Sequence, residues 1–245
     1  MAGLATLVAT ALPASADAIF KGVRGPTEWQ LDERVTYSTN DRNVTAFANT
    51  FILKYWDGKE TGKWFFAIVP YKHIDAPNGE ATGVGDITLG FGPRGTIGNT
   101  HFLTYGGITL PIGSTETIPA LGTGRYDLKI GSSVTYLTPG KGFEIDGSLE
   151  YALTGENKQG VNPPNELAAG FVIGGKIGTF RTAAGLTGVV KTDGENKGDH
   201  AVNLRGILRY VASPKFHFEV IGDRTILNEN MPKATSVTGI MRYNL

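Results

Sequence analysis

Charged residues occupy alternate positions in two neighbouring stretches of this sequence, and apolar residues fill the positions between them. The charged positions are Arg125, Asp127, Lys129, Glu144, Asp146 and Glu150. A β-strand points alternate side chains to opposite faces, so these charges share one face and the apolar residues share the other. A turn at Gly140 would set Lys129 opposite Glu150 on that face. Such a face can form cross-strand ion pairs that stiffen a barrel wall.

A second charged set with the same alternation lies near the end of the sequence. It consists of Arg205, Arg209, Glu219, Asp223 and Arg242. A tight turn after Val211 would set Arg209 opposite Glu219. The same register would set Arg205 opposite Asp223. The wider set on this face adds Asp32, Arg34, Arg181, Lys191 and His217. Both signs are well represented, so we expect an interior of mixed charge.

Residue types that carry catalysis are present but are not grouped. The four histidines lie far apart, without the spacing of metal ligands, and no serine lies in a nucleophile-elbow sequence. They are His73, His101, His200 and His217. The glycine segments 83–86 and 122–124 do not open a helix, so phosphate binding is not indicated. We therefore expect no catalytic residue, no metal, no cofactor and no enzyme activity. A membrane-embedded lipid hydrolase, which would bring His and Ser together from different strands, is kept as a further hypothesis beside the two given below.

The alternating stretches predict long strands. They run about ten to thirteen residues, whereas strands of soluble sandwiches usually run about five or six. We place strands near 28–39, 43–56, 63–74, 86–96, 101–112, 125–137, 143–154, 166–178, 180–191, 200–211, 215–226 and 234–245. An even set of about twelve long strands with one apolar face predicts an all-β protein, a transmembrane antiparallel up-and-down β-barrel. A soluble β-sandwich, which also alternates, is the alternative fold.

Side chains in the apolar phase of these strands are predicted to face lipid. They include Leu128, Ile130, Val134, Ile145, Leu149, Val202, Leu204 and Val220. Aromatic residues gather near strand ends, where a membrane barrel places its interface girdles. These are Trp29, Tyr37, Tyr55, Trp56, Trp64, Tyr71, Tyr136, Tyr151, Phe180, Tyr210, Phe216 and Tyr243. The strand at 63–74 is apolar on both faces, so its phase is not defined by the sequence.

The connections between these strands alternate in length. Every second one is tight, at 57–62, 97–100, 138–142, 179 and 212–214, as in periplasmic turns. The others are mostly longer, at 75–85, 113–124, 155–165, 192–199 and 227–233, as in extracellular loops. The connection at 40–42 is a short exception. We therefore expect the long connections outside the cell.

Composition narrows the class of protein. The chain has no Cys, which excludes disulfides, and 23 basic residues balance 23 acidic ones, so nucleic acid is not an expected partner. No stretch reaches the roughly 20 apolar residues of a membrane helix. Residues 1–18 resemble a secretory signal peptide that lacks its basic start, with cleavage after Ala16 or Ala18. A short amphipathic arm is the alternative. We assign 19–245 to a single β-barrel domain.

Three segments carry a family resemblance. They are Gly83-Val84-Gly85-Asp86-Ile87-Thr88-Leu89-Gly90, then Leu110-Pro111-Ile112-Gly113, then Leu121-Gly122-Thr123-Gly124-Arg125-Tyr126-Asp127-Leu128. Over about fifty residues the sequence resembles the outer-membrane transporter family named for the MetA pathway of phenol degradation. The resemblance implies a β-barrel transporter in the outer membrane of a Gram-negative cell that admits aromatic or other poorly soluble small molecules. It supplies no binding residues.

These observations support two main hypotheses of function. The first is an outer-membrane channel that passes small solutes by diffusion through a narrow lumen of mixed charge. The second is a structural or surface-interaction barrel whose interior is plugged by its own charges. The expected partners are outer-membrane lipid, small solutes and the barrel assembly machinery, although Leu245 replaces the terminal Phe that this machinery usually meets. The sequence leaves the oligomeric state open.

Overall fold

The computed structural model describes residues 29–57, 61–139, 142–157, 160, 162–213 and 215–245, and the proposed signal peptide lies outside this part. Thirteen strands make up the regular structure of the described residues. They are β1 (Trp29–Asn40), β2 (Thr45–Trp56), β3 (Gly62–Ala76), β4 (Gly79–Val84), β5 (Ile87–Ile97), β6 (Thr100–Leu110), β7 (Asp127–Leu137), β8 (Phe143–Thr154), β9 (Glu166–Ile177), β10 (Phe180–Lys191), β11 (His200–Ser213), β12 (Phe216–Glu229) and β13 (Ala234–Asn244).

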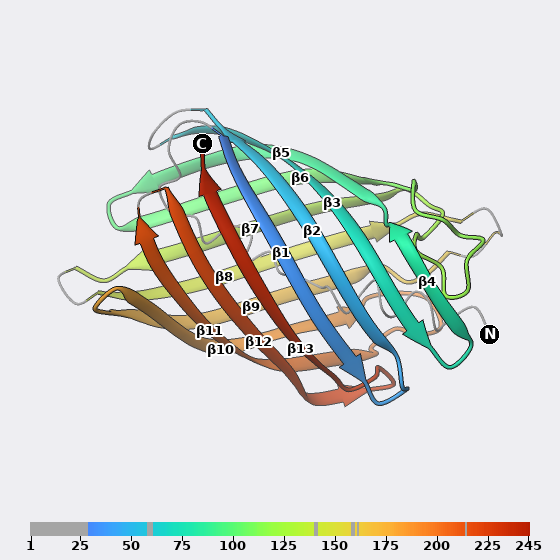
Figure 1. The fold of residues 1–245 in the computed structure, drawn as a ribbon. Helices are drawn as coiled ribbons and strands as arrows, with labels where there is room; N and C mark the ends of the chain where they lie inside the picture. Colours follow the sequence, from blue (N-terminus) through green and yellow to red (C-terminus); the bar gives the residue numbers. More distant parts are fainter. Residues whose placement is uncertain (1–28, 58–60, 140–141, 158–159, 161, 214) are drawn as a thin grey trace.

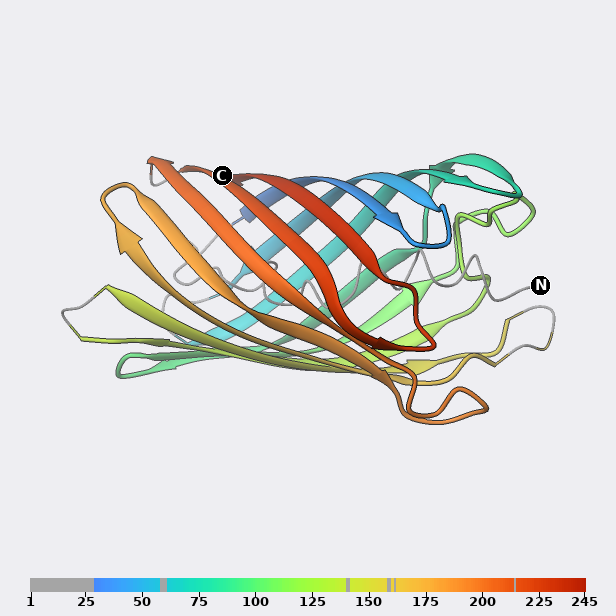
Figure 2. The ribbon, with the colours of Figure 1, turned by 90° about the horizontal axis from the view of Figure 1, so that it is seen from below.

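The strands form one closed antiparallel sheet. Each long strand pairs with its neighbours in the chain, β1 pairs with β13, and β2 pairs with β3 to complete the ring. Figures 1 and 2 show the strands crossing the barrel obliquely, as closure of a sheet requires. The ring has twelve wall strands when β4 and β5, which pair with the same strand β3, are counted together. The all-β, antiparallel barrel of about twelve strands is therefore confirmed, and the soluble sandwich is wrong.

Strand β4 corrects the expectation of a loop at 75–85. One end of β3, from Tyr71 to Ala76, pairs with β4, whereas the other end, from Gly62 to Ile68, pairs with β5. β4 and β5 together therefore act as one wall strand interrupted at Gly85 and Asp86. This segment lacks the apolar alternation of the other strands, but pairing with β3 uses backbone groups, which every residue except proline supplies in full.

The two faces of the wall differ as the alternation predicted. Six of the predicted lipid-facing side chains, Leu128, Ile130, Val134, Leu149, Leu204 and Val220, are between 45% and 64% exposed. Ile145 and Val202 are partly exposed. A soluble monomer rarely exposes such a continuous apolar band, so the outer face fits a membrane. The opposite face carries most of the buried polar and charged side chains.

The connections also differ between the two ends of the barrel. Short turns join the strands at one end, and the longer connections, including 111–126, lie at the end that contains β4 (Figure 1). The prediction of longer connections at this end is confirmed for 111–126, 155–165 and 192–199. It is wrong for 75–85 and 227–233, where only 77–78 and 230–233 join the strands. The side of the membrane on which the connections lie stays a prediction. Among the described residues, no helix is long and apolar enough to cross a membrane.

Two tryptophans correct the predicted aromatic girdles. Trp29, Tyr37 and Tyr71 are exposed on the outer face, as girdle residues should be. Trp56 and Trp64 are instead buried inside the barrel. The prediction failed because β2 and β3 carry apolar residues on both faces. The sequence alone therefore does not show which apolar side chains point inward, and strand register decides it.

Candidate functional site

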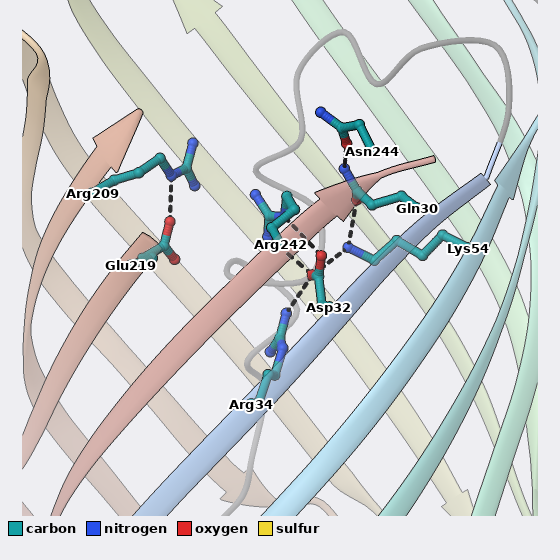
Figure 3. Close-up of polar contacts among 8 residues, drawn as sticks. All are labelled: Gln30, Asp32, Arg34, Lys54, Arg209, Glu219, Arg242 and Asn244. Carbon is teal, nitrogen blue, oxygen red and sulfur yellow. Dashed lines mark hydrogen bonds and ion pairs between the residues drawn. The ribbon is translucent and has the colours of Figure 1, made fainter. Parts of the chain in front are cut away.

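Six buried charged residues lie near one another on the inner wall, as a group of four around Asp32 and a neighbouring ion pair. This ionic cluster consists of Asp32, Arg34, Lys54, Arg209, Glu219 and Arg242 (Figure 3). Asp32 is its centre, with none of its surface exposed. Its carboxylate accepts hydrogen bonds from Arg242 Nε at 2.8 Å, Arg242 Nη2 at 3.0 Å and Lys54 Nζ at 2.7 Å. Arg34 Nη2 lies 3.6 Å away. One carboxylate therefore faces three cations.

Strand register brings this cluster together. Asp32 on β1 pairs in register with Arg242 on β13, although 210 residues separate them. Lys54 reaches Asp32 from β2 and also donates to Gln30 Oε1 at 3.1 Å. Glu219 on β12 accepts a hydrogen bond from Arg209 on β11. Paired charges of this kind can be buried because each desolvated group finds an opposite charge.

The predicted cross-strand ladder near the end of the chain exists. Arg209 pairs in register with Glu219, and Arg205 pairs with Asp223 at 2.7 Å. A charged side chain that lines a water-filled interior is expected to keep contact with water. That expectation is wrong for Arg205, Arg209 and Glu219, which are all buried, whereas the Asp223 side chain is 18% exposed.

The other predicted lumen-lining residues also lie on the inner face. Arg125 binds Asp127 at 2.8 Å, and Thr135 donates to Asp146 at 2.5 Å. Arg181 on β10 binds Glu144 at 2.8 Å. Whether these side chains line an open path stays a prediction.

Lys129 and Glu150 are not opposite each other. Lys129 pairs in register with Ala152, two positions away from Glu150. The Lys129 ammonium still lies 3.7 Å from the Glu150 carboxylate, diagonally across the strands. The assumed centre of the turn misplaced the register by two residues, which preserves the face but shifts the partner.

An apolar network covers another part of the same inner wall. This aromatic cluster consists of Ile52, Trp56, Trp64, Phe66, Leu103 and Tyr105. The Trp64 ring stacks on Trp56 at 5.4 Å and on Phe66 at 4.7 Å between centroids. Tyr105 meets Phe66 edge-on at 5.6 Å. Such stacked and edge-on pairs stabilise a cluster beyond its buried area.

Glycines on neighbouring strands make room for these rings. A Cβ atom on Gly90 of β5 would clash with the Phe66 ring, and one on Gly131 of β7 would clash with the Tyr105 ring. The two rings therefore occupy the space that a side chain would take at Gly90 and Gly131. This arrangement was missed by sequence reasoning, and the only signal was the surplus of apolar side chains in 63–74.

The ionic and aromatic clusters adjoin along β2. Lys54 lies between Ile52 and Trp56 on the inner face of that strand. Asp32 pairs in register with Ile52, and Lys54 pairs with Phe66. Lys54 was not among the expected interior charges, because the inward positions of β2 are otherwise mostly apolar.

Asp86 holds the long connection 111–126 against the wall. Its carboxylate accepts hydrogen bonds from Gly113 N at 3.0 Å, Thr123 N at 2.6 Å and Thr123 Oγ1 at 2.7 Å. Leu121 of the same connection packs with Ile74 and Ala81. The three sequence segments that carried the family resemblance therefore meet in one structural unit, the Asp86-anchored loop.

The histidines do not form a site. His73 bonds Thr82 at 2.7 Å and His101 bonds Thr96 at 2.8 Å, on different strands. Within the described residues no group of His, Asp and Glu could hold a metal ion.

Comparisons with known proteins agree with this architecture. The model of the family described as "Putative MetA-pathway of phenol degradation" matches residues 30–238. No curated protein sequence matches the chain. An outer membrane channel from Pseudomonas putida F1 has a similar structure, with a TM-score of 0.77 and 14% identity over 89% of this chain and 96% of that one.

Two further solved structures show how widely this fold is shared. The translocator domain of the autotransporter NalP from Neisseria meningitidis matches with a TM-score of 0.61 and 13% identity, over 99% of this chain and 100% of that one. The monoaromatic hydrocarbon channel CymD matches with a TM-score of 0.50 and 8% identity, over 88% of this chain and 87% of that one. At these identities the likeness shows an outer-membrane barrel fold.

Proposed function

Because this chain belongs to the family described by the MetA pathway of phenol degradation, we propose that it is an outer-membrane channel for small solutes, aromatic or hydrophobic compounds among them. Solutes cross by diffusion through the interior of the barrel. The observation that carries this proposal is the aromatic cluster on the inner wall. It places four aromatic rings where barrels of this kind usually present polar side chains.

The chemistry of the inner wall suits such solutes. Trp56, Trp64 and Phe66 form a buried stack of rings in this wall, and the Arg94 guanidinium lies 4.9 Å from the centroid of the Trp56 ring. A planar apolar solute gains contact area on rings of this kind without needing hydrogen bonds. One structure of similar fold is named as a monoaromatic hydrocarbon channel, which agrees with this choice of solute.

Charges of both signs line the rest of the interior and give the proposed lumen a mixed charge. Arg205 with Asp223 and Arg181 with Glu144 are examples. Neighbouring opposite charges cancel much of each other's field, so we expect only a weak preference between small cations and anions. The outer band of apolar side chains would contact outer-membrane lipid.

Single-channel recording in planar bilayers tests the proposal. We expect discrete current steps from the reconstituted protein and brief interruptions of that current when phenol is added. The variant Phe66→Ala should shorten the interruptions, because it removes one ring face, whereas Phe91→Ala on the outer face should not. A barrel that inserts but carries no current contradicts the proposal.

A structural barrel with a plugged interior is the second candidate. The complete burial of Asp32 and Lys54 favours it, since charges that line a wide aqueous path would remain partly exposed. The same recording separates the two functions, because a plugged barrel conducts no ions. A lipid hydrolase is not proposed, since the residues described here include no assembled His and Ser pair.

A further inference from the structure

We propose that the interior of the barrel holds a binding site for an aromatic carboxylate. The carboxylate binds at Arg34 beside the ionic cluster, and the ring lies toward Ile52 and Phe66 of the aromatic cluster. This inference rests on the proposed function, since it names the solute class of the same interior.

The first argument is the balance of charge in the ionic cluster. Four of its side chains are cations, Arg34, Lys54, Arg209 and Arg242, and two are carboxylates, Asp32 and Glu219. All six are buried. Buried charge is costly unless an opposite charge compensates it. Asp32 serves three of these cations, and its contact with Arg34, at 3.6 Å, is longer than those with Lys54 at 2.7 Å and Arg242 at 2.8 Å. The environment of Arg34 therefore favours an additional anion.

The second argument is the state of Arg34. Its side chain is 5% exposed, and its Nε and Nη2 atoms have no hydrogen-bond partner in the described part of the chain. Its ion pair with Asp32 is 3.6 Å long, because the Asp32 oxygens already accept from Arg242 and Lys54. Figure 3 shows the Arg34 guanidinium beside this occupied carboxylate.

The geometry of the Arg34 guanidinium indicates which kind of anion would bind to it. Its N–H groups form a planar fork that matches the two oxygens of a carboxylate. Buried N–H groups without acceptors are costly, so a carboxylate at this position satisfies both the charge and the hydrogen bonds of Arg34. A halide would neutralise the charge but would match the fork less well.

The third argument is the apolar surface next to the charge. Ile52, which pairs in register with Asp32, is buried in the aromatic cluster and pairs across β2 and β3 with Ile68. Phe66 is in register with Lys54. Arg34 is on β1, and Ile52 lies on the neighbouring strand β2, two positions along from Thr50, the register partner of Arg34. A ligand whose charged end meets Arg34 therefore finds apolar side chains on β2 and, one strand further, on β3. An aromatic carboxylate combines these two ends in one small molecule.

The first experiment uses the unaltered protein and a pair of isosteric ligands. Isothermal titration of the folded barrel in uncharged detergent compares benzoate with neutral benzamide, and acetate tests the contribution of the ring. We expect benzoate to bind about tenfold or more tightly than benzamide, which is the effect of one charge-assisted hydrogen bond. Acetate should also bind more weakly than benzoate. Equal affinities for benzoate and benzamide, or for benzoate and acetate, overturn the inference.

A pair of arginine variants locates the site. Arg34→Gln should weaken benzoate binding by about tenfold or more and leave benzamide binding unchanged. Arg34→Lys should retain part of the affinity, because it keeps the charge without the fork. Arg224→Gln, which removes an exposed arginine from β12, should bind benzoate like the unaltered protein. Heat-modifiable electrophoretic mobility verifies folding, and full benzoate affinity in folded Arg34→Gln contradicts the assignment.

These experiments test the binding site and the channel function independently. Titration needs no transport, so discrimination between benzoate and benzamide by a barrel that carries no current supports the inference and contradicts the proposed channel. Current without that discrimination supports the channel and overturns the carboxylate site.

Discussion

The ionic cluster and the aromatic cluster bury large side chains on the same barrel wall in two different ways. In the ionic cluster, Asp32 and its three cationic neighbours are desolvated together and compensate one another. In the aromatic cluster, the Phe66 and Tyr105 rings occupy the space that side chains would take at two glycines. The comparison shows that the ionic cluster is stabilised by complementary charges. The aromatic cluster is instead stabilised by close packing of rings into the space left by glycines. Each side should therefore be sensitive to a different kind of substitution.

Removing the central carboxylate should have the largest effect. Asp32→Asn leaves Arg34, Lys54 and Arg242 without the charge that compensates them, and breaking a buried ion pair costs about 3 to 5 kcal/mol. The free energy of unfolding in urea, measured on protein in lipid vesicles, should fall by this amount. Asp223→Asn, at a more exposed pair, should cost less. Equal losses in the two variants would show that burial does not set the strength of the ionic cluster.

A single methyl group should disturb the aromatic side. Gly90→Ala places a Cβ atom against the Phe66 ring, and overpacking of this kind costs about 1 to 3 kcal/mol. Gly206→Ala is the matched control, because a Cβ there meets no atom within 4 Å. The same urea unfolding measures both variants. If Gly206→Ala destabilises the barrel as much as Gly90→Ala, the close fit of the ring is not the cause.

Releasing the Asp86-anchored loop should change its accessibility to protease more than it changes the stability of the barrel. Asp86→Ala removes the acceptor of three hydrogen bonds to Gly113 and Thr123. External protease on intact cells should then cut within 111–126 several times faster, because exposed mobile loops are the preferred cleavage sites. Glu116→Ala changes an exposed charge in the same loop without touching the anchor. Unchanged cleavage in Asp86→Ala would mean that other contacts hold the loop.

The smallest effect is expected at the partly exposed pair of Lys129 and Glu150. Their side chains are 33% and 15% exposed and their charged atoms are 3.7 Å apart. Pairs of this kind contribute about 0 to 1 kcal/mol, so Lys129→Gln should leave the unfolding midpoint nearly unchanged. A loss comparable with that of Asp32→Asn would show that charges along the whole interior, rather than the ionic cluster alone, hold the wall together.

Alternation made the ionic side predictable from the sequence. Arg205, Arg209, Glu219 and Asp223 share one parity of their strands, so both their face and their partners followed from strand phase and one short turn. Their burial did not follow, because burial depends on charges brought from strands far away in the chain. The fold was predictable for the same reason, apart from β4, which lacks the apolar alternation of the other strands.

The aromatic side was not predictable, because alternation is absent where both faces are apolar. Trp56 and Trp64 lie near strand ends, the usual place of outward girdle residues, and no sequence property distinguished inward from outward. Lys54 was missed for the same reason. The matching of Phe66 to Gly90 depends on strand register, which single-strand patterns do not contain.

The contacts between the first and last strands have a consequence for the order of assembly. Gln30 with Asn244, Asp32 with Arg242 and Thr36 with Thr238 all join β1 to β13, across 202 to 214 residues of chain. None of them can form until the two edge strands of the open sheet meet. A shift of β13 by two residues would preserve its inward face but separate Arg242 from Asp32. A barrel closed out of register would therefore bury Asp32 and Arg242 without each other, and the cost of such unpaired buried charge favours the observed alignment of the two edge strands.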